Sequence, residues 1–110
     1  MNLSDYQILA LRTQRPDLTD PQRLVQSALG LTGEAGEFAD YVKKIEFHGH
    51  AVQSDDLTSE LGDVLWYLAA ACDALGVDLA EVAKQNIEKL QRRYPEGFEE
   101  QRSIWREVNE

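Results

Sequence analysis

One eleven-residue pattern occurs twice in the chain, as LTGEAGEFADY at residues 31–41 and as LTSELGDVLWY at residues 57–67. Both copies read Leu-Thr-small-Glu-x-Gly-acid-x-x-x-Tyr. Each copy lies within a run of apolar residues spaced three and four apart, which is the period of an amphipathic helix. Because only a short loop, residues 48–54, separates the two helices, they are expected to pack antiparallel. The repeat therefore predicts a helical pair in which the acidic residues of one copy face those of the other.

The rest of the chain also follows helical spacing. Proline occurs only at positions 16, 21 and 95, and β-branched runs are missing. We expect a short helix over Ser4–Arg15, capped by Ser4, and a long one that starts at an Asp20 cap followed by Pro21 and runs to about Phe47. Further helices are expected from about residue 55 to Gly76, from Asp78 to about residue 93, and in the tail after Phe98. The predicted fold class is all-α, in a single domain of residues 1–110 with its core at about 20–98 and a C-terminal tail at 99–110.

Composition restricts the classes of function. The 110 residues carry a formal net charge of −9, which disfavours binding to nucleic acid. The charge-free stretches in the middle of the chain, among them Val64–Cys72, are far shorter than a membrane span requires. The N-terminus lacks a secretory signal, and the lone Cys72 fits a reducing compartment. We therefore expect a cytoplasmic protein without a membrane partner.

The repeat places two carboxylate pairs, Glu34 with Glu37 and Glu60 with Asp63, beside the apolar stripes of their helices. Four carboxylates that converge at the edge of a core need raised pKa values or bound cations. Oxygen ligands without nearby Cys or His select hard ions, so the pattern favours Mg²⁺, with Mn²⁺ as a substitute. Helical glycines beside the acids, Gly33, Gly36 and Gly62, would let a metal–phosphate cluster approach. The alternative is a solvated acidic face, because acid pairs at this spacing are common on helix surfaces.

These residues resemble the MazG-like all-α nucleoside triphosphate pyrophosphohydrolases. Their signature of Glu-x-x-Glu, a variable gap and Glu-x-x-Asp is matched by Glu34, Glu37, Glu60 and Asp63. The family's Asn, Lys and Arg on the following helix are matched by Asn86, Lys89 and Arg93. The resemblance implies a MazG-like four-helix bundle and Mg²⁺-dependent hydrolysis of a nucleoside or deoxynucleoside triphosphate at the α–β bond, which releases the monophosphate and pyrophosphate.

The resemblance and the chemistry together assign roles to the residues. The four acids are the predicted metal ligands, and Glu37 or Glu34 is the predicted catalytic base. Lys89 and Arg93 are expected to bind the phosphates, because Arg forks and Lys point charges suit a triphosphate. Asn86 falls in an apolar stripe, where a buried amide needs a partner. The Tyr67 hydroxyl is either a substrate contact or simply a packing group. Trp66 is expected to be an interface or packing residue and Cys72 a core residue, whereas His48 and His50 are expected to be solvated. Trp105 is expected either to stack on a base or to anchor a partner subunit.

The predicted function is housecleaning of the nucleotide pool. The scaffold also resembles phosphoribosyl-ATP pyrophosphohydrolase, and a non-catalytic helical interaction protein with a structural cation site is the alternative from another class. Because so short a chain cannot cover all of its apolar helix faces, a homodimer or homotetramer is expected to complete the bundle. The base and sugar preference is not readable from these residue types.

Overall fold

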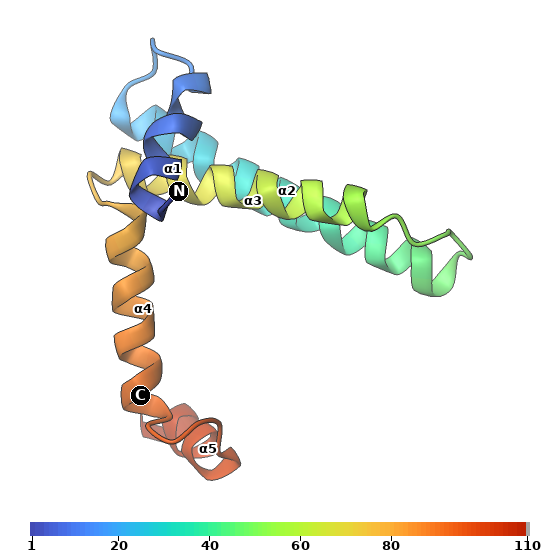
Figure 1. Cartoon of the computed structure of the whole chain (residues 1–110), viewed down its shortest axis with the longest axis vertical. Helices are drawn as coiled ribbons and strands as arrows, with labels where there is room; N and C mark the ends of the chain where they lie inside the picture. The colour runs from blue at the N-terminus through green and yellow to red at the C-terminus, as the bar shows by residue number, and fades with distance from the viewer. Residues whose placement is uncertain (110) are drawn as a thin grey trace. The chain divides into compact units, whose positions relative to one another are not determined.

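The structure, a computed structural model, describes residues 1–109, and it describes side chains as far as Arg106. Its elements are α1 (Leu3–Ala10), the 3₁₀ turn η1 (Leu11–Thr13), α2 (Asp20–Phe47), α3 (Ser54–Ala74), α4 (Leu79–Arg93) and α5 (Glu100–Asn109) (Figure 1). No strand occurs among the residues described, which confirms the all-α prediction. No helix in the described range is both long enough and apolar enough to span a membrane. Glu110, at the end of the predicted tail, lies outside the described residues.

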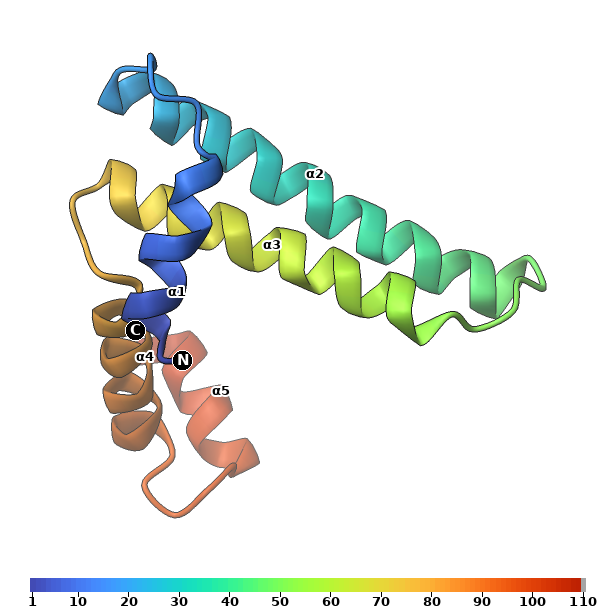
Figure 2. The same cartoon turned by 45° about the horizontal axis from the view of Figure 1, so that its top comes forward.

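The chain forms two compact units, residues 1–79 and residues 80–110, which are described one at a time. In the first unit α2 and α3 lie side by side and antiparallel, as the repeat predicts (Figures 1 and 2). A close approach joins them at Gly30 of α2, because the Tyr67 ring of α3 occupies the space that a Cβ atom would fill. The α2–α3 pair is the frame that holds both copies of the repeat.

The N-caps of the first two helices lie two residues and one residue, respectively, before the expected caps. The N-cap of α1 is Asn2, whose side chain accepts from the Asp5 N–H at 2.8 Å, whereas the expected cap, Ser4, donates its hydroxyl to Asp78 at 3.1 Å. α1 ends at Ala10 rather than at Arg15, and the 3₁₀ turn η1 follows it to Thr13. Helical geometry is disfavoured at Arg15 itself, because Pro16 follows it. The N-cap of α2 is Thr19, which forms a capping box with Gln22. These corrections leave the helix order unchanged.

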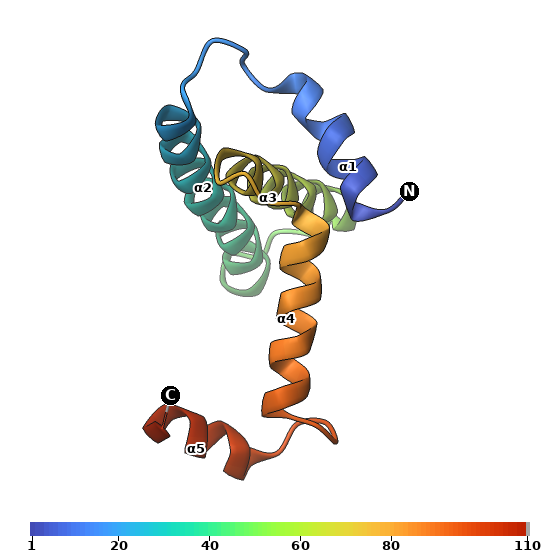
Figure 3. The ribbon, with the colours of Figure 1, turned by 90° about the vertical axis from the view of Figure 1, so that its left-hand side faces the viewer.

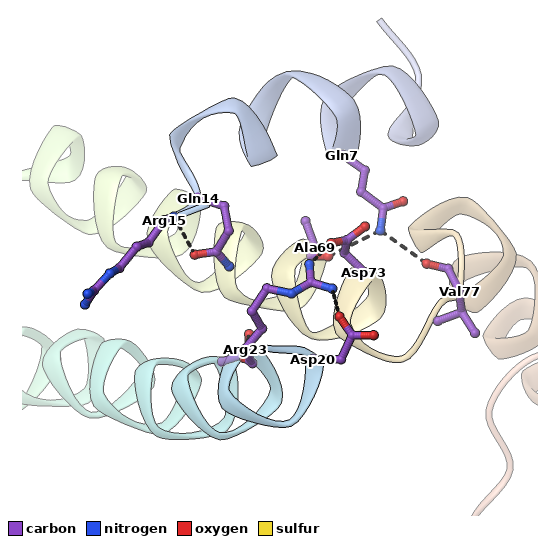
Figure 4. Close-up of polar contacts among 9 residues, drawn as sticks. Gln7, Gln14, Arg15, Asp20, Arg23, Ala69, Asp73 and Val77 are labelled. Atoms are coloured by element: carbon purple, nitrogen blue, oxygen red, sulfur yellow. Dashed lines mark hydrogen bonds and ion pairs between the residues drawn. The ribbon is translucent and has the colours of Figure 1, made fainter. Parts of the chain in front are cut away.

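Polar contacts fasten one end of the α2–α3 pair (Figure 4). Arg23 of α2 pairs with Asp73 of α3 and with Asp20 at 2.6 Å. Gln7 of α1 is buried, and its amide donates to the carbonyls of Ala69 and Val77, each at 3.2 Å. The Gln7 carbonyl oxygen accepts from the Leu79 N–H at 2.9 Å. One buried amide therefore ties α1 to the end of α3 and to the backbone that begins α4.

The core beside Gln7 is small. It consists of Ala69, Cys72 and Leu79, with Tyr6 and Leu65 packed against it, so the packing role predicted for Cys72 is confirmed. Trp66 also packs inside the first unit, because its indole N–H donates to the Ala10 carbonyl at 3.0 Å and to the Thr13 hydroxyl oxygen at 2.9 Å. The apolar stripe of α2 is covered only in part, since Leu31, Phe38 and Ile45 are half-buried while Leu24, Ala28, Ala35 and Val42 are exposed. Within the first unit, part of the apolar helix surface is therefore left uncovered.

The second unit holds α4 and α5, which a tight turn joins (Figure 3). The Gly97 N–H donates to the Tyr94 carbonyl at 3.2 Å, and Gly97 has φ +94°, a backbone conformation that side chains disfavour. The rings of Tyr94 and Phe98 contact each other across the turn, with centroids 5.5 Å apart. These contacts set the direction in which the chain leaves α4 and enters α5.

The close approach at Gly30 makes a stability prediction. Gly30→Ala is expected to lower the free energy of unfolding by about 1–3 kcal/mol, because the added methyl overlaps the Tyr67 ring. Gly33→Ala is the matched control on the same helix, where a Cβ meets open space and the better helix propensity gains up to about 1 kcal/mol. Urea denaturation followed by circular dichroism measures both. A Gly30→Ala chain as stable as the Gly33→Ala chain would contradict the packing of Tyr67 on α2.

Candidate metal centre

Three carboxylates of the repeat come together across the α2–α3 pair. One oxygen each from Glu34 and Glu37 of α2 and from Glu60 of α3 lie within 4.8 Å of one another. Helical spacing of three residues places Glu34 and Glu37 on one face of α2, and the antiparallel packing brings α3 against that face. Glu34 and Glu60 are half-buried and Glu37 is exposed. We call Glu34, Glu37 and Glu60 the acidic triad.

The electrostatics of the triad are unfavourable in the absence of a cation. Glu34 Oε2 and Glu60 Oε2 are shielded from solvent. When both side chains are ionised, neither oxygen receives a hydrogen bond from the described residues. The pKa of Glu60 is raised to about 7, first because its protonated form shares a hydrogen bond with Glu34, then because burial and the charges of Glu37 and Glu34 disfavour ionisation. A site that retains a proton near neutral pH is one where a divalent cation is strongly favoured.

Asp63 is not part of this close group of oxygens. It lies one helical turn beyond Glu60 on α3, has a shorter side chain and is exposed. Its charge acts instead on Tyr6, whose pKa is raised by burial and then by Asp63. The sequence predicted four equivalent carboxylates, and in the structure three converge while the fourth lies at the margin.

A groove of about 590 Å³ opens beside the triad, and Glu37 and Glu60 line it. Gly33 and Gly36 form part of its wall, and a Cβ at either position would meet no atom within 4 Å, so this stretch of α2 leaves room for a ligand. This agrees with the expectation from the helical glycines. Gly30 differs from them, because its missing side chain serves helix packing.

The groove also contains residues that sequence reasoning did not select. Asp40 pairs with Lys44 at 2.8 Å and with Lys43 at 2.9 Å, and these ion pairs, that with Lys44 first, lower the pKa of Asp40 to about 2. Asp40, Lys44 and His50 line the groove. The i, i+4 spacing of Asp40 and Lys44 was the available signal, but such pairs occur on many helix surfaces. His48 and His50 are both exposed, as predicted.

The sequence left two roles open for Tyr67, packing and substrate contact, and in the structure its ring packs between the helices. Its ring fills the space beside Gly30 and meets the Trp66 ring edge to face, with centroids 5.0 Å apart and planes at 84°. A contact between its hydroxyl and a substrate stays a prediction.

Asn86, Lys89 and Arg93 belong to α4 in the second unit. Lys89 and Arg93 are half-buried, and both line a hollow that α4 shares with α5. Asn86 is exposed within the described residues of its own unit, although it falls in the apolar stripe of α4. The predicted phosphate contacts of these residues remain a prediction.

Comparison with known proteins identifies the family. Residues 22–98 match the MazG nucleotide pyrophosphohydrolase domain, and the chain belongs to that family. It is 41% identical over 105 residues to the Gene 37 protein of Mycobacterium phage L5, which covers 88% of this chain and 92% of the phage protein. It is 36% identical over 73 residues to the uncharacterized protein YvdC of Bacillus subtilis (strain 168), covering 58% of this chain and 69% of YvdC. No solved structure shows significant similarity. The family acts on nucleotides and uses divalent cations.

The raised pKa of Glu60 predicts how pH affects stability. The pKa is about 7 in the folded chain against 4.5 for an ordinary Glu, so the folded state holds a proton that the unfolded state releases between these values. This contribution to stability is complete below pH 4.5 and is lost as the pH rises through 7. In the presence of EDTA, Glu60→Gln should therefore raise the melting temperature more at pH 8 than at pH 5. Glu88→Gln, at an exposed position of α4, is the control. If both variants changed the melting temperature equally at both pH values, the raised pKa of Glu60 would be contradicted.

Proposed function

We propose that this chain hydrolyses nucleoside or deoxynucleoside triphosphates at the α–β bond, with release of the monophosphate and pyrophosphate. The observation that carries the proposal is the acidic triad, which opens onto a groove in a chain of the nucleotide pyrophosphohydrolase family. The proposed role is housecleaning of the cytoplasmic nucleotide pool by a single MazG-like domain. Phosphoribosyl-ATP is the alternative substrate within the same chemistry.

The donor set of the triad fits a hard divalent cation. Its side chains offer only carboxylate oxygens, and Glu34 and Glu60 each have one oxygen that is shielded from solvent and has no hydrogen-bond donor among the described residues. We propose that Glu34, Glu37 and Glu60 hold Mg²⁺, for which Mn²⁺ can substitute, and that Asp63 contributes from the margin. A bound Mg²⁺ would neutralise phosphate oxygens and polarise the anhydride.

The remaining roles follow from exposure and charge. Glu37 is the exposed member of the triad and lines the groove, so it is the carboxylate best placed to take a proton from an attacking water. Glu34 is the second candidate for this role. Lys89 and Arg93 supply positive charge for the pyrophosphate that leaves, and Asn86 and Tyr67 are proposed substrate contacts.

We further propose that the chain works as a homodimer or homotetramer. Large apolar side chains of α2 and α3 remain exposed in the single chain, among them Leu29 at 70% and Leu61 at 51%. Burying such side chains against a second copy removes apolar area from water at about 25 cal/mol per Å².

The reaction is tested by its products. With millimolar Mg²⁺, the purified chain should release pyrophosphate and a monophosphate from at least one of the eight common NTPs and dNTPs or from phosphoribosyl-ATP, and EDTA should abolish the release. Chromatography of the products with pyrophosphate detection gives the measurement. A diphosphate and orthophosphate as main products, or full activity after exhaustive chelation, would overturn the proposal.

The triad is tested by one substitution and its control. Glu37→Gln should lower turnover at least about 10²-fold, because it removes a metal ligand or the base while keeping the shape of the side chain. Glu46→Gln removes the same charge from an exposed position of the same helix outside the groove and should leave turnover unchanged. Circular dichroism checks that both variants are folded. Normal turnover of Glu37→Gln would mean that the triad is only a solvated acidic face.

The oligomer is tested by mass. Light scattering after size-exclusion chromatography should give two or four times the 12.5 kDa of the chain. Leu29→Glu should shift the mass towards the monomer, since it places a charge on the exposed apolar face of α2. Val52→Glu, in the loop between α2 and α3, is the control and should not. A wild-type monomer at micromolar concentration would contradict the assembly.

A further inference from the structure

A second hollow lies within the second unit, between α4 and α5, and measures about 650 Å³. This volume is within the range of small-molecule sites. Five cationic side chains and one aromatic ring line it: Lys89, Arg92, Arg93, Arg102, Trp105 and Arg106. None of the described side chains that line the hollow is acidic.

The two helices contribute their residues in the same spacing. On α4 the cations occupy positions 89, 92 and 93, and on α5 the two arginines and the tryptophan occupy positions 102, 105 and 106, beside Gln101, which also lines the hollow. The pattern i, i+3, i+4 places each set on one helix face. The turn that joins the helices is held by the Gly97–Tyr94 hydrogen bond and by the Tyr94–Phe98 ring contact. One face of α4 and one face of α5 therefore line the hollow.

The charge of this hollow is opposite to that of the whole chain. The formal net charge is −9, yet five of the eleven Lys and Arg residues converge here. The ion pair of Arg102 with Glu99 is long, at 3.7 Å, and largely exposed, so it offsets little of the charge of Arg102. Cations gathered in one hollow repel each other, and a bound anion lowers this repulsion. Lys89, Arg93 and Arg106 are half-buried, which strengthens that repulsion.

Trp105 narrows the class of anion. It is 62% exposed and lines the same hollow as the cations. A large exposed indole beside several guanidinium groups suits a ligand that has both a flat aromatic part and phosphates. A nucleotide has both, whereas inorganic phosphate or an acidic peptide uses the charges alone.

We propose that α5 forms a wall of the nucleotide-binding site, with Trp105 stacking on the base and Arg102 and Arg106 joining Lys89 and Arg93 on the phosphates. This inference rests on the proposed function and extends it, since Lys89 and Arg93 are shared while the α5 residues are new. An indole can stack on any base, because every base has a π-face. Trp105 therefore adds affinity for nucleotides without discriminating among the bases.

Binding is measured by calorimetry on the full chain in EDTA, so that hydrolysis does not interfere. The probes are the four common dNTPs and inorganic tripolyphosphate. Trp105→Ala should raise the Kd of the dNTPs about ten- to a hundred-fold and leave that of tripolyphosphate within about twofold. Arg106→Gln should weaken both kinds of probe by about tenfold, because it removes a phosphate contact.

Two matched controls lie on the same helices. Ile104→Ala shortens the exposed neighbour of Trp105, and Lys84→Gln removes a cation of α4 that does not line the hollow. Both should bind all probes as the wild type does. Circular dichroism of each variant verifies the helix content.

The outcomes separate the inference from the reaction. Unchanged dNTP affinity of Trp105→Ala, or an equal loss for dNTPs and tripolyphosphate, overturns the stacking role. Tighter binding of a single-stranded oligonucleotide than of any dNTP also overturns it, in favour of a nucleic-acid surface. Pyrophosphate release with Mg²⁺ is read in a separate assay. If Trp105→Ala weakens dNTP binding but the wild type releases no pyrophosphate, the binding site is supported and the proposed reaction is overturned. If the wild type releases pyrophosphate but Trp105→Ala binds dNTPs normally, the reaction is supported and the stacking role is overturned.

Discussion

Repulsion among Glu34, Glu37 and Glu60 is the constraint around which the first unit is built. Antiparallel packing of α2 on α3 brings the three carboxylates together, and the same helix pair is closely packed where the Tyr67 ring lies against Gly30. The repulsion is relieved by a proton, as the raised pKa of Glu60 shows, or by a cation. A fold that retains this strain in its empty state is prepared to bind metal.

The helices and the acidic pairs could be predicted from sequence because both are local or repeated features. Apolar residues at spacings of three and four identify each helix, and the repeated Leu-Thr-small-Glu pattern with its short loop identifies the antiparallel pair. The ends were less predictable. Thr19 rather than Asp20 caps α2, because the Thr19–Gln22 capping box satisfies more backbone groups than a single carboxylate does.

Long-range details were not readable. Nothing in the sequence around Gln7 marks it as the buried amide that meets Ala69, Val77 and Leu79, because those partners are more than sixty residues away. The unequal roles of the four acids depend on side-chain length and position along α3, which separate Asp63 from the triad. Exposure of Asn86 likewise depends on what packs over α4, and an apolar stripe alone does not give that.

The chain also divides its charge between its two units. Residues 1–79 contain thirteen of the twenty acids, including the triad, whereas six of the eleven bases lie in residues 80–110. Each unit has a group of like charges that needs a counter-charge: a cation for the triad, an anion for the hollow between α4 and α5. A magnesium–nucleotide complex contains a cation, the metal, and anionic groups, the phosphates. The charge pattern of each unit, taken by itself, therefore favours the same class of ligand.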